Sequence, residues 1–464
     1  MTMNLLIPLL FVGLGIILFM SGRQRALAIS GGRLDALHSK PSYHGTFLGI
    51  LALAPAISLI VLWLLSYRFF SEIYLTTQLG AVFDAIPAAE QSTFLREAHR
   101  LSEGVSFGEI SPLLDQASVI LSGFRSTGNN LVILASAIFI AGGSWFGFQR
   151  ISRTLRARQF VERSVMTLLI AASAVAIVTT LGIVLSLIFE SIRFFEKVPF
   201  FNFIFGTHWS PQSAFEGAGT EASARNAEVF GAVPVFAGTA LITLIAILVA
   251  APIGLMAAIY LSDYAGPSVR AMAKPLLEVL AGIPTVVYGF FAALTVAPFF
   301  RQTGEAAGFA VSSESALAAG LVMGIMIIPF ISSLSDDVIN AVPQSLRDGS
   351  AALGATKSET IVKVVLPAAL PGIVSAFMLA ISRAIGETMI VVMAAGLAAN
   401  LTGNPLEAVT TVTVQIVTLL VGDQEFDSAK TLAAFALGLV LFCVTLVLNI
   451  VALRVVQKFQ EQYD

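Results

Sequence analysis

The sequence predicts an all-α protein that crosses a membrane about nine times. Of its 464 residues, 56% are hydrophobic and only 12% are charged, and the mean hydropathy is +0.87. Soluble domains carry about 25% charged residues, so this composition excludes an ordinary soluble fold. Helices are the expected form, because backbone groups inside hydrocarbon must pair with one another.

Nine segments are apolar enough to be spans, each of which needs roughly 20 residues to cross about 30 Å of hydrocarbon. In chain order they are 4–20, 46–66, 131–148, 165–190, 230–261, 276–300, 315–334, 372–398 and 432–453. The segment 407–422 is apolar but falls short of a clean span, and we expect a re-entrant or interfacial helix there.

The distribution of Lys and Arg predicts the orientation. If the loop at 335–371 is cytoplasmic, the connections on its side hold 16 Lys and Arg, whereas those on the opposite side hold nine over much longer loops. This positive-inside bias places the N-terminus outside and the C-terminus in the cytoplasm. The first residues, MTMNLLIPLL, have no positive n-region, so we expect an uncleaved first span.

The chain divides into two blocks. Residues 1–164 hold three spans and a long outside loop at 67–130, in which apolar residues at helical spacing predict two or three short amphipathic helices. Residues 165–464 hold six spans and the cytoplasmic loop at 335–371.

Several function classes are excluded. The net charge is −3 with no block of like charges, so no nucleic-acid partner is expected. A single cysteine, Cys443, cannot form an internal disulfide. No G-x-x-x-x-G-K-[ST] loop exists to hold ATP, and the four histidines do not form a metal-ligand pattern, so we expect no cofactor and no metal. Nothing indicates an enzyme, because no nucleophile–base set is present.

The loop at 335–371 has a helix–glycine–helix pattern that an ordinary connection between spans seldom has. It begins with Asp336 and Asp337, which cannot stay in hydrocarbon, and Gly354 is expected to end the first helix. The second helix starts near Ser358, with Glu359 in its first turn, where the helix dipole favours an anion.

One predicted span carries two charges, Arg383 and Glu387. An ionised side chain inside a span costs about 2.5–3.5 kcal/mol on insertion scales, which makes it a candidate functional residue. At i and i+4 the two side chains share a helix face and can pair. A structural ion pair is one interpretation. The other is that the guanidinium binds a passing oxyanion, that Glu387 holds Arg383 when the path is empty, and that Ser382 and Thr388 add hydroxyl donors.

The loop resembles the EAA loop of ABC importer permeases, whose spacing is EAA, three residues, Gly, nine residues, Ile, one residue and Leu-Pro. Here the matching residues are Asp348, Gly349 and Ser350, then Gly354 after Leu353, then Val364, and then Leu366 and Pro367. Asp for Glu keeps the charge, whereas Gly and Ser for two alanines lower helix propensity. The resemblance implies that this helix docks on a separate ATPase and transmits its closure to the spans.

Further motifs are similar to the phosphate-specific ABC importers: LAGIPTVVYGFF at 280–291, LPAALPGIVSA at 366–376 and RAIGETM at 383–389. The resemblance implies a type I permease core of six helices, with Arg383 and Glu387 in the translocation path and Pro284, Thr285 and Tyr288 beside it. Met389 is similar to PstC-type subunits, whereas PstA-type subunits tend toward Ala-Pro. Residues 1–164 resemble the extension of longer PstC forms.

The resemblance implies a permease of a bacterial inner membrane that carries inorganic phosphate inward. Its expected partners are a PstA-like permease, two copies of a PstB-like ATPase, an outside phosphate-binding protein and the lipid bilayer. The alternatives are a PstA-like subunit, a permease for sulfate or molybdate, an ATP-independent anion transporter or channel, and a scaffold that relays phosphate status.

Overall fold

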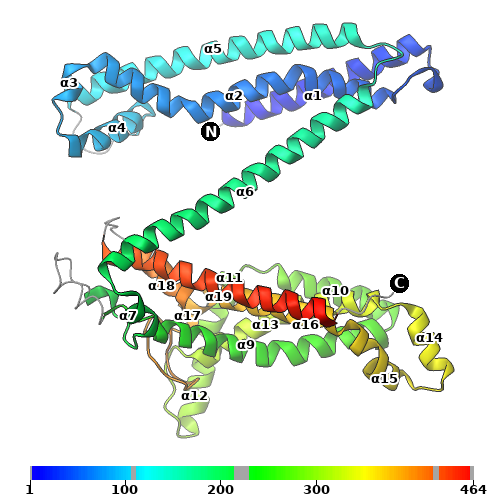
Figure 1. Ribbon diagram of the computed structural model, residues 1–464, viewed down its shortest axis with the longest axis vertical. Helices are drawn as coiled ribbons and strands as arrows, with labels where there is room; N and C mark the ends of the chain where they lie inside the picture. Colours follow the sequence, from blue (N-terminus) through cyan, green and yellow to red (C-terminus); the bar gives the residue numbers. More distant parts are fainter. Residues whose placement is uncertain (1–2, 106–110, 214–228, 422–427, 460–464) are drawn as a thin grey trace. The chain divides into compact units, whose positions relative to one another are not determined.

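The computed structural model describes residues 3–105, 111–213, 229–421 and 428–459 (Figure 1). Residues 106–110 of the expected outside loop and residues 460–464 of the expected cytoplasmic tail lie outside the described residues. The chain forms two compact units, residues 1–177 and 178–464, and the boundary falls within a single long helix. Each unit is described by itself.

The first unit contains the helices α1 (Met3–Ser30), α2 (Pro41–Leu79), α3 (Ala81–Asp84), α4 (Ala88–Ser102), α5 (Pro112–Arg150) and the first half of α6 (Ala157–Lys197), with a 3₁₀ turn, η1, at Leu34–Ala36. The second unit begins with the rest of α6 and continues with α7 (Phe200–Phe205), η2 (Pro211–Ser213), α9 (Val233–Ile259), η3 (Tyr260–Tyr264), α10 (Pro267–Ala281), α11 (Thr285–Phe291), η4 (Ala292–Val296), α12 (Ala297–Ala306), α13 (Ala316–Ala341), α14 (Gln344–Ala352), α15 (Lys357–Thr360), η5 (Ile361–Val365), α16 (Leu366–Ile385), α17 (Met389–Ala394), α18 (Val412–Leu420) and α19 (Ala429–Phe459). The elements η3, η4 and η5 are π-helical turns.

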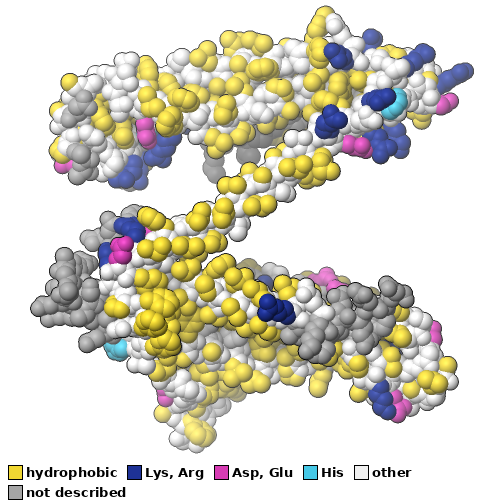
Figure 2. Space-filling model, viewed as in Figure 1, with side chains coloured by type: hydrophobic (Ala, Val, Ile, Leu, Met, Phe, Trp, Pro, Cys, Tyr) yellow, Lys and Arg dark blue, Asp and Glu magenta, His cyan; other side chains and the backbone are white. Residues whose placement is uncertain are grey.

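The all-α polytopic membrane fold is confirmed. Among the described residues, eight helices are long and apolar enough to cross a membrane, and the bent pair of α10 with α11–α12 would make a ninth span. Apolar side chains cover much of the visible flanks of the long helices (Figure 2). Such surfaces are stable against lipid, because lipid tails are as apolar as the side chains.

The first unit is built on the packing of α1 and α5 against α2. The helices approach closely at glycines: a Cβ atom on Gly45 would collide with the Phe19 carbonyl oxygen in α1, and one on Gly143 would lie 2.8 Å from Ala52 Cα. Small residues at such crossings are the usual means of bringing membrane helices together.

The predicted loop at 67–130 contains two short helices, α3 and α4, as expected, but most of its other described residues belong to the long helices α2 and α5, which corrects the expected extent of the loop. Both α2 and α5 have 39 residues, and about 58 Å of helix exceeds the roughly 30 Å of hydrocarbon. The residues taken for loop are therefore largely the ends of these two helices. An apolar cluster explains the extra length: it joins them to α3 and α4 through Leu75, Leu79, Phe83, Ala98, Ala117 and Leu121.

The core of the second unit lies where α9, α13, α16 and α17 meet. Its largest buried side chains include Ile242, Met323, Ile327 and Ile390. A second cluster joins the end of α6 and α7 to α18 and α19. The helices α14 and α15 lie at the other end of this unit from α7 and α18 (Figure 1).

Two predicted spans are broken, which corrects their expected form as single helices. The span expected at 276–300 turns by 86° between α10 and α11, where Gly282 and Pro284 separate the two helices. The span expected at 372–398 ends as a helix at Ile385, and α17 begins at Met389. A proline has no N–H to continue a helix, and a glycine weakens one, so the first break follows from the sequence.

The apolar segment 407–422 contains one short helix, α18. Thr411 caps it by accepting a hydrogen bond from the Val414 N–H. Inside the helix, the buried amide of Gln415 accepts from Trp209 Nε1 at 2.9 Å and donates to the Leu397 carbonyl at 3.0 Å. The segment is thus packed into the second unit, and a re-entrant position in the membrane remains our expectation.

Candidate functional site

The segment that resembles the EAA loop begins with α14, but the loop expected at 335–371 is shorter at both ends. The helix α13 continues to Ala341, so Asp336 and Asp337 lie in its last turns, and residues 366–371 already belong to α16. Cations of α10 form ion pairs with both carboxylates, and these pairs allow Asp336 and Asp337 to remain within α13.

The helix–glycine–helix pattern is confirmed as a structure. Gly354 has a φ of +85°, a left-handed conformation that residues other than glycine rarely adopt, and one residue, Leu353, separates it from the end of α14. The next helix, α15, starts with a capping box in which the Thr356 hydroxyl accepts from the Glu359 N–H and the Glu359 carboxylate accepts from the Thr356 N–H. A hydrogen bond of 2.9 Å between the Ser350 and Thr360 hydroxyls holds the two helices together.

The outer face of this segment is open. Asp348 and Gly349 are exposed on α14, and Gln344 Nε2 donates to Asp348 Oδ1 at 3.0 Å. Leu353, just beyond the helix, is 90% exposed. Leu366 and Pro367 begin α16, into which η5 leads without a break.

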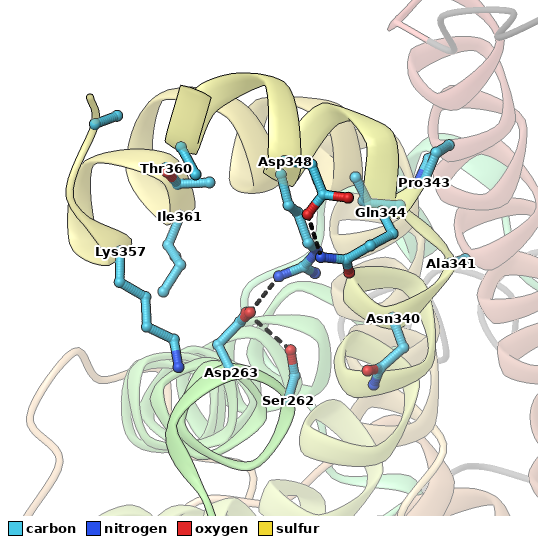
Figure 3. A pocket seen from close by; sticks show the side chains of 14 residues that line it. Ser262, Asp263, Asn340, Ala341, Pro343, Gln344, Asp348, Lys357, Thr360 and Ile361 are labelled. Atoms are coloured by element: carbon cyan, nitrogen blue, oxygen red, sulfur yellow. Dashed lines mark hydrogen bonds and ion pairs between the residues drawn. The ribbon is translucent and has the colours of Figure 1, made fainter. Parts of the chain in front are cut away.

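A polar pocket of about 650 Å³ lies between η3 and the helices α14 and α15 (Figure 3). Arg347 crosses it to form an ion pair with Asp263 in η3, and it also donates to the Ile339 carbonyl at 2.9 Å. The Ser262 hydroxyl donates a hydrogen bond to the Asp263 carboxylate at 2.9 Å. Both charged side chains of the ion pair are largely buried, so removal of either one would leave the other charge unpaired and cost more than the loss of a surface pair. The pair joins α14 to η3, which continues α9.

A second charged cluster joins α10 to α13. Asp336, only 2% exposed, accepts from Arg270 at 3.0 and 3.1 Å and from Lys274 at 3.1 Å. Lys274 also reaches Asp337 at 3.0 Å, and Asn340 Nδ2 donates to Asp336 at 2.8 Å. These contacts fix the first arm of the broken span to the helix that leads into α14.

Arg383 lies in the last turn of α16 and is exposed. Its guanidinium carbon is 5.8 Å from the centre of the Phe330 ring in α13, a cation–π contact. Among the described residues, no carboxylate forms an ion pair with it.

The ion pair expected between Arg383 and Glu387 is not formed. Since α16 ends at Ile385, the two residues do not share a continuous helix. The Glu387 side chain, 9% exposed, instead accepts from the N–H groups of Met389 and Ile390 at 3.0 and 3.3 Å. A carboxylate at the start of a helix satisfies otherwise unpaired donors and is favoured by the helix dipole, which explains why Glu387 turns to α17.

The remaining predicted path residues come from two parts of the second unit: α11, and the segment from α16 to the start of α17. Tyr288 is buried in α11 and donates to the Leu280 carbonyl at 2.9 Å, across the break between α10 and α11. Thr285 is the first residue of α11. Ser382 donates to Asn449 in α19 at 3.2 Å, and the hydroxyl of Thr388 lies 3.5 Å from the Gly386 carbonyl. The structure thus brings Tyr288 to the core of α16 and α17, whereas Ser382 turns to α19.

Sequence reasoning missed the charged contacts that hold the site. Arg270, Lys274, Asp263 and Arg347 received no role from the sequence, although Arg270 and Lys274 are spaced one helical turn apart. That spacing marks one helix face, yet it does not reveal which distant carboxylate the face meets. The partners lie 62 to 84 residues away in the chain.

Two protein families match the chain. Residues 7–179 match a family described as a phosphate ATP-binding cassette transporter. Residues 250–461 match the family of binding-protein-dependent transport system inner membrane components, and this range contains all predicted path and coupling residues.

Several relatives are 30–32% identical to this chain over the residues that align. The probable ABC transporter permease protein YqgH of Bacillus subtilis is 32% identical over 46% of this chain and 67% of its own length. The phosphate transport system permease protein PstC of Mesorhizobium japonicum is 30% identical over 61% of this chain and 86% of its own. PstC 1 of Mycobacterium tuberculosis is 30% identical over 55% and 82%.

Proposed function

We propose, from the premise that the chain belongs to the PstC family of phosphate-transport permeases, that phosphate passes Arg383 while α14 transmits the movement of an ATPase. The chain is a permease subunit of a phosphate ABC importer. It is a multi-pass membrane protein and a transport subunit, and its family implies an ATPase and a binding protein as partners.

The observation that carries the proposed path is that the Arg383 guanidinium forms no ion pair with a carboxylate among the residues that the structure describes. Arg383 is exposed at the end of a membrane helix, and the nearest predicted counter-charge, Glu387, is engaged in capping α17. A guanidinium presents five donors in a fork that matches an oxyanion, so an unpaired Arg383 is suited to bind phosphate in passing. Glu387 then shapes the break beside Arg383 and does not compete with the anion.

The proposed coupling runs through two charged contacts. The exposed Leu353 and Asp348 would meet the ATPase, and a displacement of α14 would pull on the end of α9 through Arg347 and Asp263. The same displacement moves α13, and Asp336 carries it to α10. Beyond the break, α11 packs on α17, where a Cβ atom on Gly289 would lie 2.8 Å from the sulfur of Met393. This close fit would pass the movement to the helix that Glu387 caps.

The proposal also includes the partner subunits and the orientation of the chain in the membrane. The partner permease would be PstA-like, two copies of a PstB-like ATPase would hydrolyse ATP, and a phosphate-binding protein would deliver the anion from outside. The Lys and Arg distribution supports an inner-membrane orientation with the N-terminus outside and α14 in the cytoplasm.

Uptake of radiolabelled phosphate tests the path. Cells that lack their own importer would receive the partner subunits with the native chain, with Arg383→Gln or with Arg301→Gln, a control that removes an exposed arginine of α12. We expect uptake to fall at least tenfold with Arg383→Gln and to stay near native with Arg301→Gln, at equal amounts of inserted protein. Equal uptake by both variants would contradict the proposed path.

Two alternative functions give different results in the same cells. A permease for another oxyanion would take up sulfate or molybdate in place of phosphate. An ATP-independent transporter or channel would still carry phosphate when the ATPase partner is inactivated, whereas the proposed importer would stop.

A further inference from the structure

The first unit carries a concentrated positive charge to which the transport proposal gives no role. We define the basic cap as residues 21–45 and 149–164, the two connections at one end of this unit. The cap holds nine Lys and Arg against two acidic residues, a net charge of +7. All nine cations are exposed: Arg23, Arg25, Arg33, Lys40, Arg150, Arg153, Arg156, Arg158 and Arg163. Figure 2 shows dark blue side chains gathered at this end of the unit.

The basic cap is a folded surface. Its two connections are hydrogen-bonded to each other, since the His38 N–H donates to the Arg153 carbonyl at 3.0 Å and the Arg153 side chain donates to the Ile29 carbonyl at 2.9 Å. Beneath them Ala26, Leu37 and Ile151 form a small buried cluster. The cations are therefore held close together at a fixed place, although like charges repel.

The cap borders exposed aromatic side chains at the end of α5. Arg25 lies 5.0 Å from the centre of the Phe148 ring, and Arg150 lies 4.7 Å from that of Phe146. Trp145, one residue earlier, is 72% exposed. Trp is enriched at the level of the lipid headgroups, so Trp145 supports a position of these cations near the phosphodiester groups.

We propose that the basic cap binds the headgroups of anionic phospholipids such as phosphatidylglycerol. The positive-inside bias alone requires only an excess of cations. The net charges of the two connections in the cap, +3 and +4, are each higher than that of any other connection in the chain. Clusters of four to eight Lys and Arg next to membrane helices attract anionic lipids by about fivefold in affinity per cation. Glu162 is already paired with Arg158 at 2.6 Å, so only Asp35 opposes this attraction directly. The first unit would thereby anchor the permease in anionic lipid.

Native mass spectrometry of the full-length chain tests the proposal, with phosphatidylglycerol and phosphatidylcholine titrated separately at low salt. The test variant replaces Arg23, Arg33 and Arg156 by Gln, because their side chains form no hydrogen bond, ion pair or cation–π contact with the residues that the structure describes. The control replaces Arg68, Arg96 and Arg100, which belong to α2 and α4 at the opposite end of the unit, so it changes the net charge equally.

We expect phosphatidylglycerol to bind the native chain and the control alike, and the test variant on the order of 100-fold more weakly. Replacing the same three arginines by Lys keeps the charge and should keep binding within about threefold, which separates lost charge from lost folding. Equal binding of the two lipids, or an equal loss in the test and control variants, would overturn the proposal. So would displacement of the bound lipid by the ATPase subunit at the cap, because the site would then belong to a protein.

Discussion

Nζ of Lys274 in α10 lies 3.1 Å from Oδ2 of Asp336 in α13, a residue with only 2% of its surface exposed. The contact joins the first arm of a broken span to the helix that precedes α14. Because Asp336 is almost completely buried, its charge is tolerated only while Arg270 and Lys274 remain in place. The two cations thus fix the relative position of α10 and α13.

Asp336→Asn should destabilise the second unit and weaken the link between ATP hydrolysis and transport. Removing one partner of a fully buried ion pair costs about 3–5 kcal/mol, and here the cations are about one-third exposed, so we expect about 2 kcal/mol. Thermal unfolding of the purified chain would measure the loss. The ratio of phosphate carried to ATP hydrolysed by the assembled importer should also fall.

Asp337→Asn is the matched control, because Asp337 is the next residue and also contacts Lys274, but its side chain is 62% exposed. Surface ion pairs contribute about 0–1 kcal/mol. We therefore expect nearly native stability and coupling. If both variants behaved alike, burial of Asp336 would not be what makes its contacts important.

Gly354→Ala should weaken the turn after α14 by about 1–2 kcal/mol, since a side chain in the left-handed region carries that cost. Apart from its neighbours in the chain, no atom of the described residues lies within 4 Å of the Cβ position, so the backbone conformation alone causes the effect. Gly349→Ala is the comparison: it places alanine inside α14, also in open space, and should stabilise the helix by about 0.5–1 kcal/mol. Opposite shifts in hydrogen exchange of α14 peptides would confirm both; shifts of the same sign would contradict the assigned turn.

A double-mutant cycle distinguishes the observed geometry from the pairing expected from the sequence. Because Glu387 caps α17 and Arg383 contacts Phe330, Arg383→Gln and Glu387→Gln should affect stability nearly additively, within about 0.5 kcal/mol. Thermal unfolding of the two single variants and the double variant measures this. An interaction energy well above that limit would show that the two charges pair after all. Glu387→Ala, which removes both accepted hydrogen bonds, should cost more than Glu387→Gln.

Much of this fold was predictable because membrane helices are specified by composition and length. The number of spans, the turn at Gly354 and the first-turn position of Glu359 all follow from local rules about apolar length, left-handed glycine and helix dipoles. These rules act over a few residues, so the sequence contains everything they need.

The errors arose where a distant partner decides the local structure. Residues 67–79 are helical because Leu75 and Leu79 pack on α3 and α4, and periodicity alone did not separate this from short independent helices. At the end of α16, the i and i+4 spacing favoured an ion pair between Arg383 and Glu387. The Glu387 carboxylate instead accepts hydrogen bonds from the first N–H groups of α17. Such competition depends on where the next helix begins, which the residue pattern of RAIGET does not state.

His99 should make the tip of the first unit sensitive to pH. Burial lowers the pKa of His99 below its usual value of 6.5, with a smaller contribution from the nearby Arg68 cation, and Nε2 has no hydrogen-bond partner among the described residues. The folded state therefore binds a proton less readily than the unfolded state. Its contribution to stability is complete above pH 6.5 and is lost progressively as the pH falls below that value.

Hydrogen exchange of α4 peptides, corrected for intrinsic exchange rates, should show protection that is constant from pH 8 to about 7 and then decreases toward pH 5. His99→Leu removes the titrating group from a half-buried position beside the Tyr67 ring, so the decrease should become shallower. His38→Leu, at an exposed position of the basic cap, should leave the α4 profile unchanged. If His99→Leu kept the native pH dependence, another group would be responsible, because a leucine cannot bind the proton.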